Sequence, residues 1–261
     1  MDVTLHAVFD GPPTASPLVL GPSLGTTTDM WQPQIAALAE HFRVVRFDHP
    51  GHGGSPSEPA PRTIADLGAG VLSLLDDASI DRVSYVGLSL GGMVGMWLAA
   101  HAPERIDRLA LLCTSAQLGP PEYWHQRASA VTTEGMGVIV DSVPVRWFTP
   151  AFRGGNPAVY DHYCEMLRGS KPDGYAACCE VIATMDLRAD LARIEADTLV
   201  IAGADDEAIP VTHSAAIASA IAGSRLEVVA DSAHLANVEQ PARITDLLLD
   251  HLLDLRAEEM A

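Results

Sequence analysis

The stretch Gly87-Leu88-Ser89-Leu90-Gly91 decides the fold of this 261-residue chain. The segment before it, Arg82–Val86, is short and rich in β-forming residues, and the segment after it, Gly92–Ala100, has the composition of a helix. A serine between a strand and a helix lies on a tight, strained turn, where small neighbours let the chain pack closely and the hydroxyl projects above the sheet. The free N–H groups at the start of the helix favour negative charge beside it. The pattern therefore predicts that Ser89 is a nucleophile; the alternative is a glycine-lined helix start with an ordinary serine.

Short apolar segments alternate with helical ones along most of the chain. Segments typical of strands are Val3–Phe9, Pro17–Leu20, Arg43–Phe47, Arg82–Val86, Arg108–Cys113, Thr198–Ala202 and Leu226–Val229. Segments typical of helices are Trp31–His41, Ile64–Ala78, Leu90–His101, Val211–Ala222 and Pro241–Leu253. Several strands are almost wholly apolar, as expected where helices cover both faces of a sheet. The pattern predicts an α/β fold with a mostly parallel central sheet flanked by helices. The first two strands can form an antiparallel pair.

The alternation stops between residues 116 and 193, where the chain is helical and rich in methionine and aromatic residues. We expect a core made of residues 1–115 and 194–261, with residues 116–193 inserted as a helical cap. Open α/β sheets bind ligands at the carboxyl edge of their strands, so the cap is expected to cover that edge. The alternative is a plain helical subdomain.

Composition narrows the classes of partner. The formal net charge of −18 argues against nucleic acid and anionic membrane surfaces as partners. No apolar run reaches the roughly 18 residues of a membrane span, and the first residues lack the pattern of a signal peptide. The four cysteines have no zinc spacing, so free thiols and a cytoplasmic location are expected. Lys171 is the only lysine, so arginines must supply most of the local charge for any anionic ligand. The sequence predicts no oligomeric state.

A serine nucleophile needs a base, and two later loops supply candidates. In this architecture an acidic residue and then a histidine follow the serine, each in a loop after a late strand. Asp206 and His234 have this order and position. We expect His234 to take the proton of Ser89 and Asp206 to orient the imidazole. Asp205 is the rival for Asp206, Glu207 is a weaker one, and the alternative for this group is a solvated acidic turn.

The oxyanion formed by such an attack needs two backbone donors. We expect them to be the N–H groups of Leu90 and of Leu24, with Ser23 as the less favoured alternative to Leu24. The turn Asp48–Ser55 contains residue types that bind metals, but its glycine and proline content is typical of a structured turn. Neither a metal nor a cofactor is expected.

Taken together, the serine turn, the two later loops and the turn Asp48–Ser55 resemble the α/β-hydrolase superfamily over nearly the full chain. A closer resemblance is to the 3-oxoadipate enol-lactonases. It rests on Ser23–Thr26, Met30-Trp31, Gly87–Gly95, Trp97–Ala99 and Ala233–Pro241, and in the cap on Trp124–Arg127, Glu134–Met136, Arg146–Pro150 and Gly174–Glu180. The cap motifs carry most weight, because esterases of many kinds share the core motifs. The chain departs from the family at Pro22, where a polar residue is usual, and at His49-Pro50, where Thr-Arg is usual.

The resemblance implies hydrolysis of a five-membered enol-lactone with a carboxymethyl arm, giving 3-oxoadipate in the β-ketoadipate pathway of aromatic catabolism. This small-molecule substrate is an anion. The resemblance therefore suggests Arg127 as its anchor and Trp124 and Trp147 as apolar walls. The alternatives are a surface Arg127 paired with Glu122 or Glu134, and tryptophans that only fill the core.

Other functions share this scaffold. A general carboxylesterase, a carbon–carbon bond hydrolase and a cofactor-free perhydrolase would use the same core with a different cap, since the cap sets substrate choice. A non-catalytic receptor with this fold would not need all three members of the triad. Preference for the enol-lactone over a neutral ester separates the lactonase from a general esterase.

Overall fold

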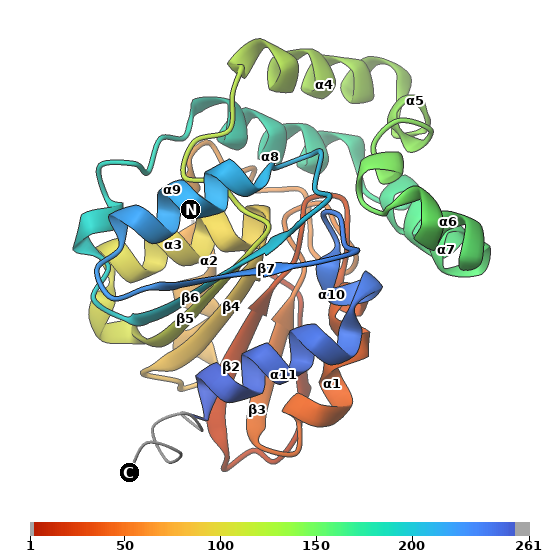
Figure 1. The fold of residues 1–261 in the computed structure, drawn as a ribbon. Helices are drawn as coiled ribbons and strands as arrows, with labels where there is room; N and C mark the ends of the chain where they lie inside the picture. Colours follow the sequence, from red (N-terminus) through yellow and green to blue (C-terminus); the bar gives the residue numbers. More distant parts are fainter. Residues whose placement is uncertain (1–2, 254–261) are drawn as a thin grey trace.

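Within residues 3–253, the part of the chain that the computed structural model describes, a seven-stranded sheet has the order β1-β3-β2-β4-β5-β6-β7 (Figure 1). The strands are β1 (Ala7–Asp10), β2 (Ser16–Gly21), β3 (Phe42–Phe47), β4 (Val83–Leu88), β5 (Ile106–Leu112), β6 (Asp197–Gly203) and β7 (Arg225–Val229). β1 runs antiparallel to β3, and all other neighbouring pairs are parallel. The predicted α/β fold with a mostly parallel sheet is confirmed.

The predicted antiparallel pairing of the first two strands is wrong. Both edges of β2 are occupied by parallel neighbours, with Leu18 opposite Val44 of β3 and Ser84 of β4. Leu18, Val19 and Leu20 have no exposed surface, which suits a central strand covered on both faces. The half-exposed β1 instead pairs with the outer edge of β3.

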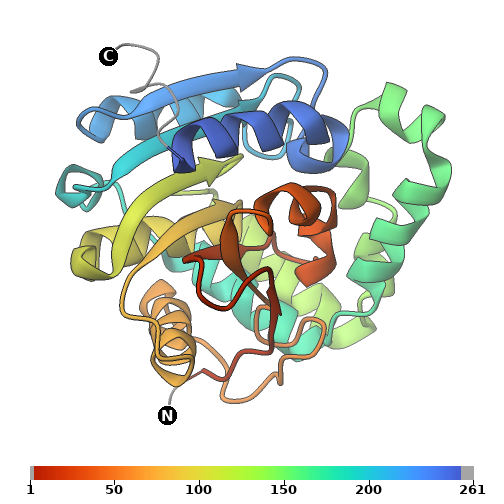
Figure 2. The ribbon, with the colours of Figure 1, turned by 90° about the horizontal axis from the view of Figure 1, so that it is seen from below.

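Helices cover both faces of the sheet. The helices outside the region between β5 and β6 are η1 (Thr28–Trp31), α1 (Gln32–Leu38), α2 (Ile64–Asp77), α3 (Leu90–His101), η2 (Pro103–Arg105), α9 (Val211–Ala220), α10 (Ala236–Glu239) and α11 (Pro241–Leu252). α2, α3 and α9 lie on one face, and α1 and α11 on the other (Figure 1 and Figure 2). α2 shows why these segments fold locally. Thr63 and Asp66 form a reciprocal cap at its start, and Ile64, Leu67 and Val71 turn one apolar stripe toward the core.

The chain between β5 and β6 is helical and lies at the carboxyl edge of the sheet (Figure 1). It contains α4 (Pro121–Glu134), α5 (Gly137–Val140), η3 (Pro144–Arg146), α6 (Pro150–Gly155), α7 (Pro157–Arg168), α8 (Pro172–Thr184) and η4 (Leu191–Arg193). α4 and α8 pack side by side above the ends of the central strands. The boundaries 116 and 193 stay a prediction, and the outermost ends of the predicted core, residues 1–2 and 254–261, lie outside the described residues.

The described residues were also searched for membrane-spanning helices and for disulfide bonds. None of the described helices is long and apolar enough to span a bilayer. Cys113, Cys178 and Cys179 are buried free thiols, and Cys164 is free and partly exposed.

Candidate active site

Ser89 lies in the turn between β4 and α3 with φ 56° and ψ −117°. A positive φ strains any residue other than glycine, typically by about 1–3 kcal/mol. The Ser89 N–H donates to the Leu112 carbonyl oxygen of the neighbouring strand over 2.9 Å, which helps to hold the turn. A Cβ on Gly87 would lie 2.3 Å from the Gly91 carbonyl oxygen, and one on Gly91 would lie 2.2 Å from that of Gly21. The glycines are therefore required for close backbone packing around the strained serine.

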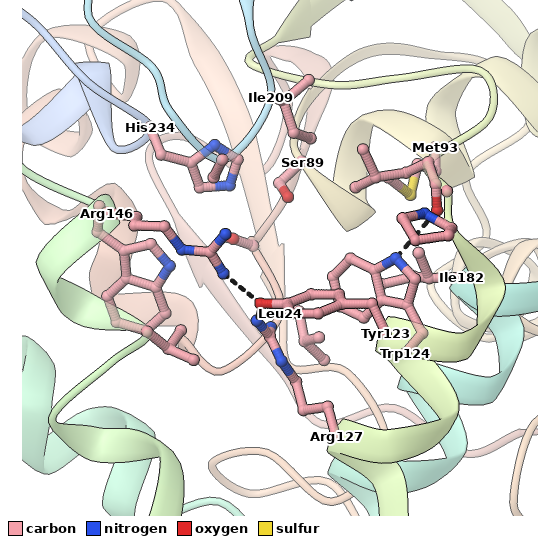
Figure 3. Close-up of a pocket in the computed structure, with 17 residues that line it drawn as sticks. Leu24, Ser89, Met93, Tyr123, Trp124, Arg127, Arg146, Ile182, Ile209 and His234 are labelled. Atoms are coloured by element: carbon pink, nitrogen blue, oxygen red, sulfur yellow. Dashed lines mark hydrogen bonds between the residues drawn. The ribbon is translucent and has the colours of Figure 1, made fainter.

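His234 and Asp206 meet at the carboxyl edge of the sheet, beside Ser89. Nδ1 of His234 lies 2.8 Å from Oδ2 of Asp206, while Oδ1 accepts from the N–H groups of Ala208 (2.8 Å) and Ile209 (2.9 Å). Both side chains are buried. The ionised carboxylate can only accept, so Nδ1 of His234 carries the proton and the other ring nitrogen is left as an acceptor. That second nitrogen faces Ser89 (Figure 3).

The neighbouring acids are placed differently. Asp205 and Glu207 are exposed and line a separate cavity of about 690 Å³. Asp205 is held through its backbone, whose N–H donates to the Ser232 carbonyl oxygen over 2.9 Å. Of the three acids in this loop, the structure brings Asp206 to the imidazole.

The hydrogen bonds around Leu24 and Leu90 distinguish the N–H groups of these two residues from those of their neighbours. The N–H groups flanking that of Leu24 are engaged, Ser23 with a methionine sulfur (3.4 Å) and Gly25 with a histidine ring (3.0 Å). The N–H of Gly91, next to Leu90, donates to a proline carbonyl oxygen over 3.0 Å. Within residues 3–253, the N–H groups of Leu24 and Leu90 have no protein acceptor. Because the Ser23 N–H already has an acceptor and the Leu24 N–H does not, the hydrogen bonds support Leu24 over Ser23 as the oxyanion donor.

Two buried histidines hold the loop that carries Leu24. Nε2 of His49 donates to the Pro22 carbonyl oxygen over 2.9 Å, and Nε2 of His52 accepts from the Gly25 N–H. Burial, followed by the neighbouring His52, lowers the pKa of His49 to about 3; burial also lowers the pKa of His52. Both rings are therefore neutral near pH 7. Across the described chain, no group of three or more His, Cys, Asp or Glu side chains is arranged to hold a metal ion.

A pocket of about 240 Å³ joins these groups to the cap (Figure 3). Its lining comes from the nucleophile turn, the two later loops, the loop after β2 and the cap helices. The lining residues are Ser23, Leu24, Ser89, Met93, Leu118, Gly119, Pro120, Tyr123, Trp124, Arg127, Val143, Arg146, Trp147, Ile182, Ala208, Ile209 and His234. All three cap residues suggested by the resemblance, Trp124, Arg127 and Trp147, thus lie in the same pocket as Ser89 and His234.

The cap wall of the pocket is aromatic and positively charged. The Arg127 guanidinium lies 4.8 Å from the ring centre of Trp124 and 4.6 Å from that of Tyr123. Trp124 donates from Nε1 to the Leu118 carbonyl oxygen over 2.9 Å, which fixes its ring against the pocket. Trp147 is 3 % exposed. Arg127 does not pair with the surface acids of its own helix, in contrast to the alternative considered from the sequence.

Comparison with known proteins agrees with this geometry. The sequence profile of the alpha/beta hydrolase fold family matches residues 16–241. The chain belongs to the α/β-hydrolase fold family. It is 38% identical over 240 residues to 3-oxoadipate enol-lactonase 2 of Acinetobacter baylyi, covering 92% of this chain and 90% of that protein.

Solved structures of this α/β-hydrolase family are also close. The crystal structure of the enol-lactonase from Burkholderia xenovorans LB400 superposes with a TM-score of 0.93 at 40% identity, covering 95% of this chain and 96% of that chain. A hydrolase from Pseudomonas aeruginosa PA01 has a TM-score of 0.92 at 44% identity, with 95% and 94% coverage. The predicted resemblance to both the superfamily and the enol-lactonases is confirmed.

A second serine–histidine contact in this α/β-hydrolase lies outside the pocket. Oγ of Ser115 is 2.7 Å from Nδ1 of His213. The same hydroxyl donates to the Gln117 carbonyl oxygen over 2.6 Å, so its one proton is used and the imidazole must be the donor. A histidine that donates to serine cannot act as its base, and the contact is structural.

The sequence analysis assigned no role to three residues of the site, Tyr123, Arg146 and Glu239. Tyr123 and Arg146 line the pocket, and both arginines donate to the Tyr123 hydroxyl. Arg146 stands in one of the quoted cap motifs, which was the available signal, but its direction depends on how the cap folds.

Glu239 connects the histidine loop to the cap in this α/β-hydrolase. One carboxylate oxygen accepts from the N–H and the hydroxyl of Thr149, both at 2.8 Å, and the other accepts from the N–H of Ala233, next to His234. On the other side of His234, the Leu235 N–H donates to the Trp147 carbonyl oxygen over 2.9 Å. The backbone on both sides of His234 is therefore fixed to the cap. Burial raises the pKa of Glu239 despite these hydrogen bonds.

Proposed function

We propose that this protein is a serine hydrolase that opens the enol-lactone of 3-oxoadipate to 3-oxoadipate in aromatic catabolism. The observation that carries the proposal is a single pocket with Ser89 and His234 on one side and Arg127 on the other. The first pair suits attack on an ester carbonyl, and the guanidinium suits the carboxylate of the lactone's arm. The enol-lactonase relatives agree with this substrate class.

The mechanism begins with proton transfer from Ser89. His234, with Nδ1 protonated and bound to Asp206, takes the serine proton on Nε2 as Oγ attacks the lactone carbonyl carbon. The tetrahedral oxyanion is stabilised by the N–H groups of Leu24 and Leu90, which have no protein acceptor among the described residues. Removing one such donor typically lowers turnover by ~10²–10³.

Collapse of this intermediate breaks the ring C–O bond. The His234 imidazolium returns the proton to the enol oxygen, giving an acyl-enzyme on Ser89 whose leaving group stays attached through the carbon chain. The enol then becomes a ketone, so ring closure is disfavoured. Water, deprotonated by His234, attacks the acyl carbon, and the carboxylate product leaves as Ser89 regains its proton.

Substrate orientation is assigned to the cap. Arg127 would hold the carboxylate of the arm, and Trp124 and Trp147 would bound the planar ring. The stacking of Arg127 on Trp124 keeps its guanidinium in one orientation, so less side-chain entropy is lost when a ligand binds.

The test is a spectrophotometric comparison of the enol-lactone with a neutral 4-nitrophenyl ester, using the wild-type protein and Ser89→Ala. We expect the wild type to prefer the lactone, and Ser89→Ala to lose turnover of both substrates while unfolding at an unchanged denaturant concentration. Substantial turnover by the folded variant would show that another residue is the nucleophile. A preference for the neutral ester would favour a general carboxylesterase.

A further inference from the structure

Arg146 enters the active-site pocket from η3, opposite the helix α4 that carries Arg127. Figure 3 shows the two guanidiniums converging on the hydroxyl of Tyr123. Nη2 of each arginine donates to this one oxygen. Arg127 also approaches the Tyr175 hydroxyl (3.4 Å), and the Arg146 guanidinium lies 5.6 Å from the ring centre of Tyr123.

The active-site pocket offers the two guanidiniums no acidic side chain, although Arg146 also borders the cavity of about 690 Å³ that Asp205 and Glu207 line. None of the described residues that line the pocket is Asp or Glu, and within residues 3–253 neither arginine is in an ion pair. Other arginines of this chain, whose net charge is −18, do pair with carboxylates, such as Arg108 with Asp197 (2.9 Å) and Arg105 with Asp76 (2.8 Å). Two like charges on one acceptor repel each other, and in a partly desolvated pocket this repulsion is weakly screened.

The Tyr123 oxygen is a poor substitute for an anion. It is neutral and it must accept from both guanidiniums, whereas a carboxylate offers two charged oxygens and roughly four acceptor sites. Hydrogen bonds from a guanidinium to a carboxylate are about twice as strong as bonds between neutral groups. A carboxylate at this point would neutralise the repulsion and satisfy both arginines.

We infer that Arg146 is a specificity-determining residue, which forms with Arg127 a two-guanidinium clamp for a carboxylate on the acyl substrate. The carboxylate replaces the Tyr123 oxygen as the shared acceptor. This inference rests on the proposed function and deepens it, because it selects acyl compounds with an anionic arm over neutral esters of the same length.

The position of Arg146 in the chain links the clamp to the catalytic base. Trp147, the next residue, accepts the hydrogen bond from the Leu235 N–H, and Leu235 follows His234. The clamp and the imidazole are therefore held on adjacent, hydrogen-bonded segments. This sets the separation between a bound carboxylate and the acyl carbon under attack, so substrates with arms of the wrong length should react slowly.

The test compares mono-4-nitrophenyl glutarate, which carries a free carboxylate, with the neutral 4-nitrophenyl butyrate. The variants are Arg146→Gln, Arg127→Gln and the matched control Arg153→Gln, an arginine of α6 that lies outside this pocket, 6.0 Å from the Tyr160 ring centre. We expect Arg146→Gln to lower kcat/KM for the anionic ester by about 10- to 100-fold, the effect of one charged hydrogen bond. The readout is the ratio of kcat/KM for the anionic ester to kcat/KM for the neutral ester, and an unchanged denaturation midpoint reports that the variant is folded.

Inhibition by glutarate provides a second measurement that requires no turnover of the ligand. We expect its inhibition constant to rise in Arg146→Gln and Arg127→Gln and to stay unchanged in Arg153→Gln. If Arg146→Gln lowers kcat/KM equally for the two esters, so that the ratio of the two values is unchanged, the inference is overturned. If the wild type opens the enol-lactone but the ratio does not move, the clamp is wrong and the proposed function stands. If the ratio moves but the enol-lactone is not opened, the clamp stands and the proposed substrate is wrong.

Discussion

Replacing Asp206 by Asn should stop catalysis without unfolding the protein. Two backbone N–H groups donate to Oδ1, at 2.8 and 2.9 Å, so the Asn oxygen will occupy this position. The amide nitrogen then faces Nδ1 of His234, which is 2.8 Å from Oδ2 in the wild type. Because that nitrogen donates, His234 must accept on Nδ1 and carry its proton on Nε2, where it can no longer take a proton from Ser89.

The magnitude follows from the cost of the opposite amide orientation. Turning the amide would leave two backbone donors unpaired at about 1–3 kcal/mol each, roughly 4 kcal/mol together. The productive tautomer would then be populated about 10³-fold less. Loss of the charge that stabilises the imidazolium adds to this, giving a fall in kcat of about 10³–10⁴. The free energy of unfolding should change by only about 1 kcal/mol, since three hydrogen bonds remain possible.

The assay is steady-state hydrolysis of a neutral 4-nitrophenyl ester, so the result does not depend on the natural substrate. Asp205→Asn is the matched control, because that exposed residue is adjacent in sequence and should leave kcat within a factor of about two. The reasoning would be refuted if Asp206→Asn kept more than a tenth of wild-type kcat, or if Asp205→Asn lost as much.

Two further predictions concern the surroundings of the site. Glu239→Gln should lower the free energy of unfolding by about 2 kcal/mol, because the NH2 group of the new side chain must face the N–H donor of either Thr149 or Ala233. It should also lower kcat. An unchanged free energy of unfolding together with an unchanged kcat would contradict this prediction. For His49, the folded pKa of about 3 lies below the unfolded value near 6.5, so its stabilising contribution is present above pH 6.5 and decreases as the pH falls. Stability should drop by ~2 kcal/mol between pH 7 and pH 5 from this residue. Denaturation at both pH values should show a smaller drop in His49→Phe than in wild type, and replacing the exposed His162 should not reduce it.

The sequence predicts the strands, most helices and the chain order of the site because these depend on local pattern. α3 spans Leu90–His101 as predicted, and the predicted final helix ends one residue later than α11. The pairing of β1 could not be read locally, because it depends on whether β2 becomes a central strand. The same holds for the choice of Asp206 over Asp205: both stand in the right loop, and burial separates them only once the loop is folded.

The cap was harder to predict than the core. Arg127 and the two tryptophans came from a resemblance and not from physical reasoning on the chain. Arg146 and Tyr123 are 23 residues apart and meet only through tertiary packing of α4 and η3. Glu239 stood in a quoted motif, but its role requires knowing that Thr149 of the cap approaches the loop of His234.

The two proposed oxyanion donors belong to the main chain of Leu24 and Leu90, and Gly91, next to Leu90, packs closely against the backbone of Gly21 at the end of β2. The Leu24 side chain lines the pocket, whereas that of Leu90 is fully buried and does not line it. Substitution of Leu24 should therefore reshape the acyl-binding surface without removing a donor. Evolution can alter the preferred acyl group at Leu24 while both backbone donors persist. Because the donors are backbone groups and the pocket wall is made of side chains, related enzymes can change substrate and keep the same catalytic centre.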